Sequence, residues 1–166
     1  MPDRKPLAAK GKVGLGLASA SAIALTMAVA ALKTDEGKRN VTYLDIARVP
    51  TYCFGHADRT ATPGSYHSDA ECDALLTADA RQTEAAVLKC TPVLADRPHQ
   101  LAAATRLAFN IGSGAYCRST VARRFNAKQW RAACDGFLAW RYAGGRAVAG
   151  LLARRERERA QCLEGL

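Results

Sequence analysis

The sequence predicts an α+β fold that is mostly helical. Near the start, residues 41–45 and 50–54 are short runs rich in Val, Thr, Tyr and Phe, separated by a turn, as is typical of a β-hairpin. Ser68 and Glu71 then form a capping-box signature, which predicts a long helix from about 69 to 90. A chain of 166 residues can build one compact domain, or two small lobes that share a helix.

The remaining segments are predicted from helical periodicity and from turn residues. Residues 55–67 are rich in Gly, Thr, Pro, Ser and His and are expected to form a loop. The Thr91-Pro92 step should end the long helix, because the residue before a proline disfavours helical geometry. The Gly112-Ser113-Gly114 run and the Gly144-Gly145 pair predict breaks between further helices, which we expect at about 98–110, 119–125, 128–142 and 148–162.

The N-terminal part of the chain predicts export. Residues 1–12 are basic, and residues 13–32 carry no charge. As a helix, that segment would be about 30 Å long, which is enough to span a hydrocarbon core. Positive charge stays on the cytoplasmic side, so residue 33 onward would enter the periplasm. Seven of the twenty residues are Ala, so the segment is only weakly apolar and could insert and later leave.

Two alternatives remain open for this segment. Residues 28–30 form an Ala-Val-Ala site after a basic region, as in a cleaved secretory signal. The segment could also serve as a permanent anchor.

Three residues after this segment suggest glycoside cleavage. Glu36 follows Thr34 and Asp35, which are possible helix caps, and Asp45 and Thr51 belong to the predicted hairpin. A glycosidic bond is cleaved by one carboxyl that protonates the leaving oxygen and a second that readies a water or acts as a nucleophile. A nearby hydroxyl can help to hold the water. A helix end followed by a hairpin can place the two carboxyls on opposite walls of one cleft.

Further motifs follow in the same order as in a known family. They are Gly55-His56, the run Ala108-Phe109-Asn110-Ile111-Gly112-Ser113-Gly114-Ala115-Tyr116, Ser119-Thr120, Trp140-Arg141-Tyr142-Ala143-Gly144-Gly145-Arg146, and Gly150-Leu151-Leu152-Ala153-Arg154-Arg155-Glu156. Together with Glu36, Asp45 and Thr51, they make residues 34–163 resemble the phage endolysins of glycoside hydrolase family 24, the T-even phage lysozyme type. The resemblance implies a lysozyme-like fold over 33–166, with a small lobe at about 33–75, a long linking helix and an all-helical lobe at about 90–166.

The resemblance also implies an activity and a role for each residue. The enzyme would be a muramidase that hydrolyses the bond between N-acetylmuramic acid and N-acetylglucosamine in peptidoglycan. Glu36 would be the general acid, Asp45 the base or water-orienting carboxylate, and Thr51 its partner in holding the water. His56 is expected to support the hairpin, and Arg154 or Arg155 to pair with Glu36. No metal or other cofactor is expected, and the protein is expected to be a monomer.

Some endolysins of this kind carry a signal-arrest-release segment, which residues 13–32 resemble. The enzyme would then be tethered, inactive, to the inner membrane until a holin or pinholin collapses the membrane potential. Release would free it into the periplasm to lyse the host cell.

Six cysteines are present, at positions 53, 72, 90, 117, 134 and 162, and no two have the short C-x-x-C spacing of a zinc or redox site. An even number in an exported chain favours disulfides. Fifteen pairings are possible, and we predict the sequential one: Cys53–Cys72, Cys90–Cys117 and Cys134–Cys162.

The net charge is +9, and residues 118–159 hold eleven Arg or Lys against three Asp or Glu. A basic face attracts polyanions, but the chain has no nucleic-acid motif, so we expect the anionic bacterial envelope to be the partner and exclude nucleic acid. Two other functions remain open. A lytic transglycosylase would need only one acid, which the presence of both Asp45 and Thr51 disfavours. A non-catalytic cationic protein could instead disrupt envelopes through its basic C-terminal helices.

Overall fold

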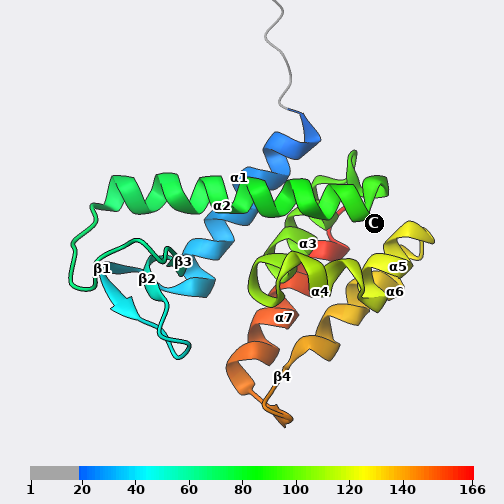
Figure 1. Cartoon of the computed structure of the whole chain (residues 1–166). Coiled ribbons are helices and arrows are strands. Elements are labelled where there is room, and N and C mark those ends of the chain that lie inside the picture. The colour runs from blue at the N-terminus through cyan, green and yellow to red at the C-terminus, as the bar shows by residue number, and fades with distance from the viewer. Residues whose placement is uncertain (1–18) are drawn as a thin grey trace, which may run out of the picture.

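The computed structural model describes residues 19–166 as a mostly helical protein with a small antiparallel sheet (Figure 1). The mostly helical α+β prediction is confirmed. Predictions that concern residues 1–18 lie outside the described residues, including the basic N-terminus and the first part of the apolar segment. In the part of the chain that is described, no helix combines the length and apolarity that a membrane crossing requires.

The first helix, α1 (Ala20–Glu36), contains most of the apolar segment together with Glu36. Ser19 is its N-cap, and the Ser19 hydroxyl accepts a hydrogen bond from the Ala22 N–H at 3.2 Å. It ends at Gly37, whose φ of 66° suits glycine and stops the helix directly after Glu36. Ala24, Ala28 and Leu32 are spaced four residues apart and are fully buried, so one stripe of α1 faces the interior.

The small sheet has three antiparallel strands in the order β1 (Arg39–Leu44), β2 (Pro50–Cys53) and β3 (His56–Ala57). The predicted hairpin is confirmed as β1 and β2. The third strand falls in the segment predicted to be a loop. Cys53 and Gly55 adopt φ values of 58° and 86°, which reverse the chain so tightly that His56 pairs with Tyr52. Such a two-residue strand has no alternating pattern for a sequence to reveal.

The long helix α2 (Asp69–Cys90) runs across the molecule in Figure 1, with the sheet near its N-terminal end and the helical lobe near its C-terminal end. The predicted capping box is confirmed, because the Glu71 N–H bonds the Ser68 hydroxyl and the Glu71 carboxylate accepts from the Ser68 N–H. A short 3-10 turn, η1 (Pro92–Leu94), follows where the sequence predicts the helix to end.

The helical lobe is built from α3, α7 and several shorter elements. They are α3 (Pro98–Ile111), α4 (Ser113–Cys117), α5 (Thr120–Asn126), α6 (Trp130–Asp135), the 3-10 helix η2 (Gly136–Trp140), the hairpin of β4 (Tyr142–Ala143) and β5 (Arg146–Ala147), and α7 (Ala149–Leu163). The single helix predicted over 128–142 is wrong. At Gly136 the α-helix tightens into a 3-10 helix, and the chain then turns into the β4–β5 hairpin, which forms one tip of the lobe (Figure 1).

Two hydrophobic cores hold these elements, and α1 contributes to both. Ala24 and Ala28 pack into the core of the helical lobe, whereas Leu32 packs into the core under the sheet with Tyr52 and Leu76. The predicted disulfides are confirmed. Cys53–Cys72 joins the sheet to α2, Cys90–Cys117 joins α2 to α4, and Cys134–Cys162 joins α6 to α7.

Candidate active site

Glu36 lies at the edge of a cavity of about 370 Å³ between the end of α1 and the small sheet. The cavity is lined by Glu36, Gly37, Lys38, Arg39, Tyr43, Cys53 and Gly55. The Glu36 side chain is 20% exposed, so its carboxyl is mostly sheltered and can still be reached from outside. A partly sheltered carboxyl at the wall of a cavity is suited to exchange a proton with a ligand.

One guanidinium holds the Glu36 carboxylate in place. Arg154 Nη2, from α7, lies 2.6 Å from Glu36 Oε1, and the Arg154 side chain is only 6% exposed. Burial would lower the pKa of Arg154, but the carboxylates of Glu36, Glu158 and Asp35 raise it above its ordinary value, so the guanidinium keeps its charge. Of the two arginines proposed from the sequence, Arg154 is therefore the partner of Glu36.

Arg155 is turned to other partners. Its guanidinium lies 2.6 Å from Glu158 and 3.1 Å from the side-chain oxygen of Asn110, and no contact of Arg155 with Glu36 is found in the structure of residues 19–166. The side chains of Arg155 and Glu158 are both fully buried. Arg155 thus belongs to the packing of α7 against α3.

Asp45 and Thr51 are held by the same residue of the β1–β2 turn. The Asp45 carboxylate accepts the Val49 N–H at 2.8 Å, and the Thr51 hydroxyl donates to the Val49 carbonyl at 3.0 Å. Asp45 directly follows β1, whereas Thr51 is buried in β2 opposite Tyr43. Tyr43 lines the Glu36 cavity, although Asp45 and Thr51 are not among the lining residues. Their catalytic roles therefore stay predictions.

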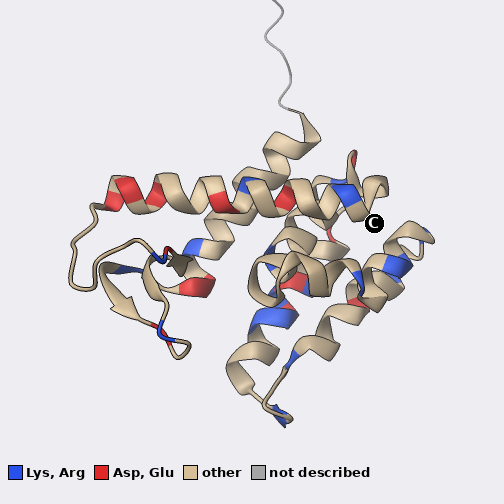
Figure 2. Ribbon diagram, viewed as in Figure 1, with Lys and Arg blue, Asp and Glu red and all other residues tan. Residues whose placement is uncertain are grey.

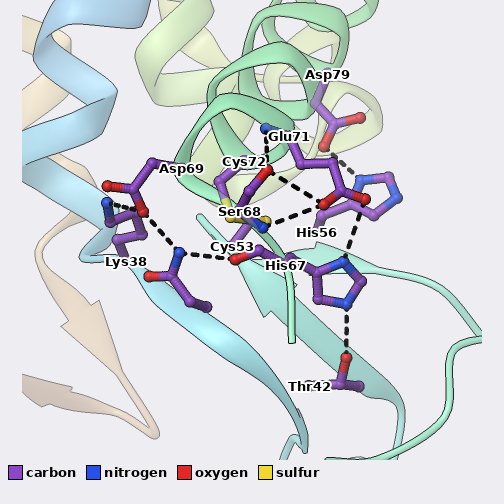
Figure 3. Close-up of a disulfide and its surroundings, with 11 residues drawn as sticks. Lys38, Thr42, Cys53, His56, His67, Ser68, Asp69, Glu71, Cys72 and Asp79 are labelled. Carbon is purple, nitrogen blue, oxygen red and sulfur yellow. Dashed lines mark hydrogen bonds and ion pairs between the residues drawn. A yellow bond between two sulfur atoms is a disulfide. The ribbon is translucent and has the colours of Figure 1, made fainter. Parts of the chain in front are cut away.

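His56 supports the hairpin by tying it to α2. Its Nδ1 lies 2.7 Å from the Asp79 carboxylate, and Figure 3 shows this contact beside the Cys53–Cys72 disulfide. His67 makes a parallel link on the same side, from the Thr42 hydroxyl at 3.0 Å to the Glu71 carboxylate at 3.7 Å. Tyr52 packs against both imidazole rings, stacked on His67 and edge-on to His56. The strand that carries Thr51 is thereby fixed to α2.

Sequence reasoning missed Asp35. The sequence suggests a helix cap, but Asp35 belongs to the last turn of α1, and its side chain is 1% exposed. It binds Arg106 of α3 and Arg157 of α7 at 2.7 and 2.8 Å. These partners are 71 and 122 residues away in sequence, so no local pattern could reveal them.

Among residues 19–166, no group of three or more His, Cys, Asp or Glu side chains is placed to hold a metal ion.

A small sheet, a long connecting helix and a helical lobe, with a glutamate of α1 held by a buried arginine beside a cavity, define a lysozyme. The family model of phage lysozyme matches residues 33–158, and the chain belongs to the phage lysozyme family. It is accordingly a muramidase that acts as an endolysin in phage lysis.

Among its relatives, the SAR-endolysin of Bacteriophage PS119 is 37% identical over 135 residues, which cover 78% of this chain and 77% of the relative. In three dimensions, the chain is similar to a single-residue mutant of P22 lysozyme, with a TM-score of 0.70 and 35% identity over 82% of this chain and 94% of that chain. It is also similar to the muramidase domain of SpmX from Asticaccaulis excentricus, with a TM-score of 0.74 and 27% identity over the same shares of the two chains.

Proposed function

We propose that this lysozyme hydrolyses the β-1,4 bond between N-acetylmuramic acid and N-acetylglucosamine in peptidoglycan, with Glu36 as the general acid. The observation that carries this proposal is the position of the Glu36 carboxyl, which lies at the wall of a cavity and is held by a buried arginine. A protonated Glu36 would give its proton to the glycosidic oxygen as the bond to the anomeric carbon breaks. The leaving sugar then departs as a neutral alcohol.

Asp45 and Thr51 would supply the other half of the reaction. An ionised Asp45 removes a proton from a water that attacks the anomeric carbon from the opposite side, and the Thr51 hydroxyl helps to orient that water. Both side chains bond to Val49, which fixes them relative to each other. Such an attack inverts the anomeric configuration, and NMR of the first-formed product reports its anomer.

The decisive experiment replaces Glu36 by Gln, which keeps the size of the side chain and removes its ability to release a proton. We expect Glu36→Gln to lose cell-wall clearing by a factor of roughly 10² or more, the usual contribution of a general acid, with an unchanged circular dichroism spectrum. Glu156→Gln is the matched control, because Glu156 is an exposed glutamate of α7. Normal clearing by Glu36→Gln would remove Glu36 as the acid.

The same proteins test the two other functions. Mass spectrometry of the digested glycan distinguishes hydrolysis, which leaves a reducing sugar, from transglycosylation, which leaves an anhydro sugar. Killing that survives both heat denaturation and Glu36→Gln would indicate a cationic envelope-disrupting protein instead.

We also propose that the protein is exported and held inactive in the inner membrane through residues 13–32 until it is released to the periplasm, with residues 1–12 in the cytoplasm and 33–166 as the catalytic domain. A holin or pinholin would act before it. The continuity of α1 supports this proposal, because one helix contains residues 20–32 and also ends in Glu36. While the segment lies in the membrane, Glu36 cannot occupy its place beside Arg154.

Raising the apolarity of the segment tests this control. Replacing Gly14 and Gly16 by Leu adds about −1 kcal/mol of insertion free energy on the translocon scale. We expect the variant to stay in the membrane fraction and to delay lysis after the membrane potential is collapsed. Lysis by this variant on the wild-type schedule would reject the release model and leave the assignment of the chemistry intact.

A further inference from the structure

Asp35, the residue before Glu36, lies buried inside a cluster of arginines. Its side chain is 1% exposed, with one carboxylate oxygen 2.7 Å from Arg106 Nη2 and the other 2.8 Å from Arg157 Nη2. Burial is the largest influence on the pKa of Asp35 and would raise it, but hydrogen bonds from Arg157 and Arg106 and the charge of Arg154 together lower it. Asp35 therefore stays ionised in the folded protein.

Arg154 links Asp35 to Glu36. Its Nε lies 3.7 Å from Asp35 and 3.2 Å from Glu158, whereas its Nη2 lies 2.6 Å from Glu36. The Nε–H of the guanidinium thus faces two buried carboxylates, whereas Nη2 contacts Glu36. Because a guanidinium is planar and rigid, contacts that fix Nε also fix the direction of Nη2. Figure 2 shows the acidic last turn of α1 in red and the basic residues of α7 in blue.

The charges around Glu36 would be unbalanced without Asp35. Arg154 faces Glu36 from α7, and Arg39 and Lys38 line its cavity, although Lys38 is paired with Asp69 at 2.7 Å. Arg106 of α3 binds Asp35, the residue next to Glu36. Besides Glu36 and Asp35, Arg154 also contacts the Glu158 carboxylate. Nearby positive charge favours an ionised carboxylate, yet a general acid must be protonated to act.

We propose that Asp35 is a positioning residue for the reaction: it fixes Arg154 through the cluster of Arg106 and Arg157 and offsets their charge, so that Glu36 can hold its proton. This inference rests on the proposed role of Glu36 as the acid. In this role the charge of Asp35 shifts the pH–activity profile in a definite direction, which a purely structural ion pair would not do.

The test is the pH–activity profile of cell-wall hydrolysis by full-length protein. Asp35→Asn keeps the shape of the side chain and removes its charge, and we expect the alkaline limb to move down by roughly one pH unit, the lower end of the usual effect of one nearby charge. Arg157→Gln removes a cation that is 53% exposed, and we expect the limb to move the opposite way. Asp135→Asn, which breaks the exposed pair with Arg159, should leave the profile unchanged.

The two signs decide the inference. If Asp35→Asn lowers activity by the same factor at every pH, or if Arg157→Gln leaves the limb where it is, Asp35 has only a structural role. If Asp35→Asn does not fold, the direction found with Arg157→Gln still decides, because that arginine is half exposed. Failure of the acid assignment would appear separately, as activity of Glu36→Gln.

Discussion

The disulfide between Cys53 and Cys72 should contribute both to stability and to the site. It closes a loop with a sequence separation of 19 residues, and the chain-entropy model gives about 3.2 kcal/mol of stabilisation at 25 °C for that length. The Cys90–Cys117 bridge closes a loop of 27 residues, for which the same model gives about 3.5 kcal/mol. The two bridges therefore form a matched pair, one beside the cavity and one in the helical lobe.

The double variants Cys53→Ala/Cys72→Ala and Cys90→Ala/Cys117→Ala can be compared by urea unfolding under oxidising conditions. We expect both to lose about 3 kcal/mol of unfolding free energy, and their melting temperatures to fall by roughly 6–13 °C for a domain of this size. Activity at 20 °C should separate them. Cys53 lines the cavity of Glu36, so its loss should lower the turnover rate roughly 10-fold by loosening the geometry. The helical-lobe variant should stay within about twofold of the wild type, because its bridge lies outside the site.

Two results would refute this reasoning. A loss below about 1 kcal/mol in both variants would show that the unfolded chain is already compact enough to make the bridges redundant. Equal losses of activity would show that Cys53 does not hold the site.

Three further outcomes follow from buried side chains. Burial raises the pKa of Glu84 above its ordinary value of 4.5, against the opposing effects of a Ser21 hydrogen bond and the charge of Arg81. The stability that Glu84 contributes is fully present below pH 4.5 and is lost as the pH rises through its folded-state pKa. Glu84→Gln should therefore gain stability relative to the wild type as the pH rises. A constant difference in unfolding free energy between the two proteins, measured in urea from pH 4 to 8, would contradict this. Glu158→Gln should cost roughly 3–5 kcal/mol in urea unfolding, because it leaves Arg154 and Arg155 buried without their shared carboxylate; a loss below 1 kcal/mol would show that the cluster rearranges. Ala28→Leu should lower the free energy of unfolding by roughly 1–3 kcal/mol, because it overpacks the core. Ala30→Leu adds the same apolar side chain at an exposed position and should lower it by less than about 0.5 kcal/mol. Equal losses would show that α1 does not pack as described.

Local signals in the sequence were sufficient for several elements. The Ser68–Glu71 capping box sets the start of α2, and the Thr91-Pro92 step sets its end, because both act within a few residues of chain. The disulfides also follow a local order, each joining neighbouring cysteines. The β4–β5 hairpin and the two-residue strand β3 were missed, because they are too short for a hydrophobic period to appear.

For the site, the sequence could identify residue types but could not predict their partners. The motif around Glu36 points to that residue as the acid, and two adjacent arginines are equally good candidates to pair with it. Only the rotation of α7 against α3 decides that Arg154 faces Glu36 while Arg155 faces Asn110. The contacts of Asp35 depend on three elements that meet in space, and its position beside Glu36 in the sequence carries no sign of them.

The Ala-rich stripe of α1 has a consequence for how the protein matures. A peptidase cut after Ala30 would remove Ala24 and Ala28 from the interior of the helical lobe, together with the Ser21 hydroxyl that bonds Glu84. We therefore expect the mature enzyme to keep its leader, and its intact mass, measured with and without reductant, should correspond to an uncut chain with three bridges. In the release model proposed above, this helix lies first in lipid and then in the protein interior. Alanine suits both, being apolar enough for the first and small enough for close packing in the second.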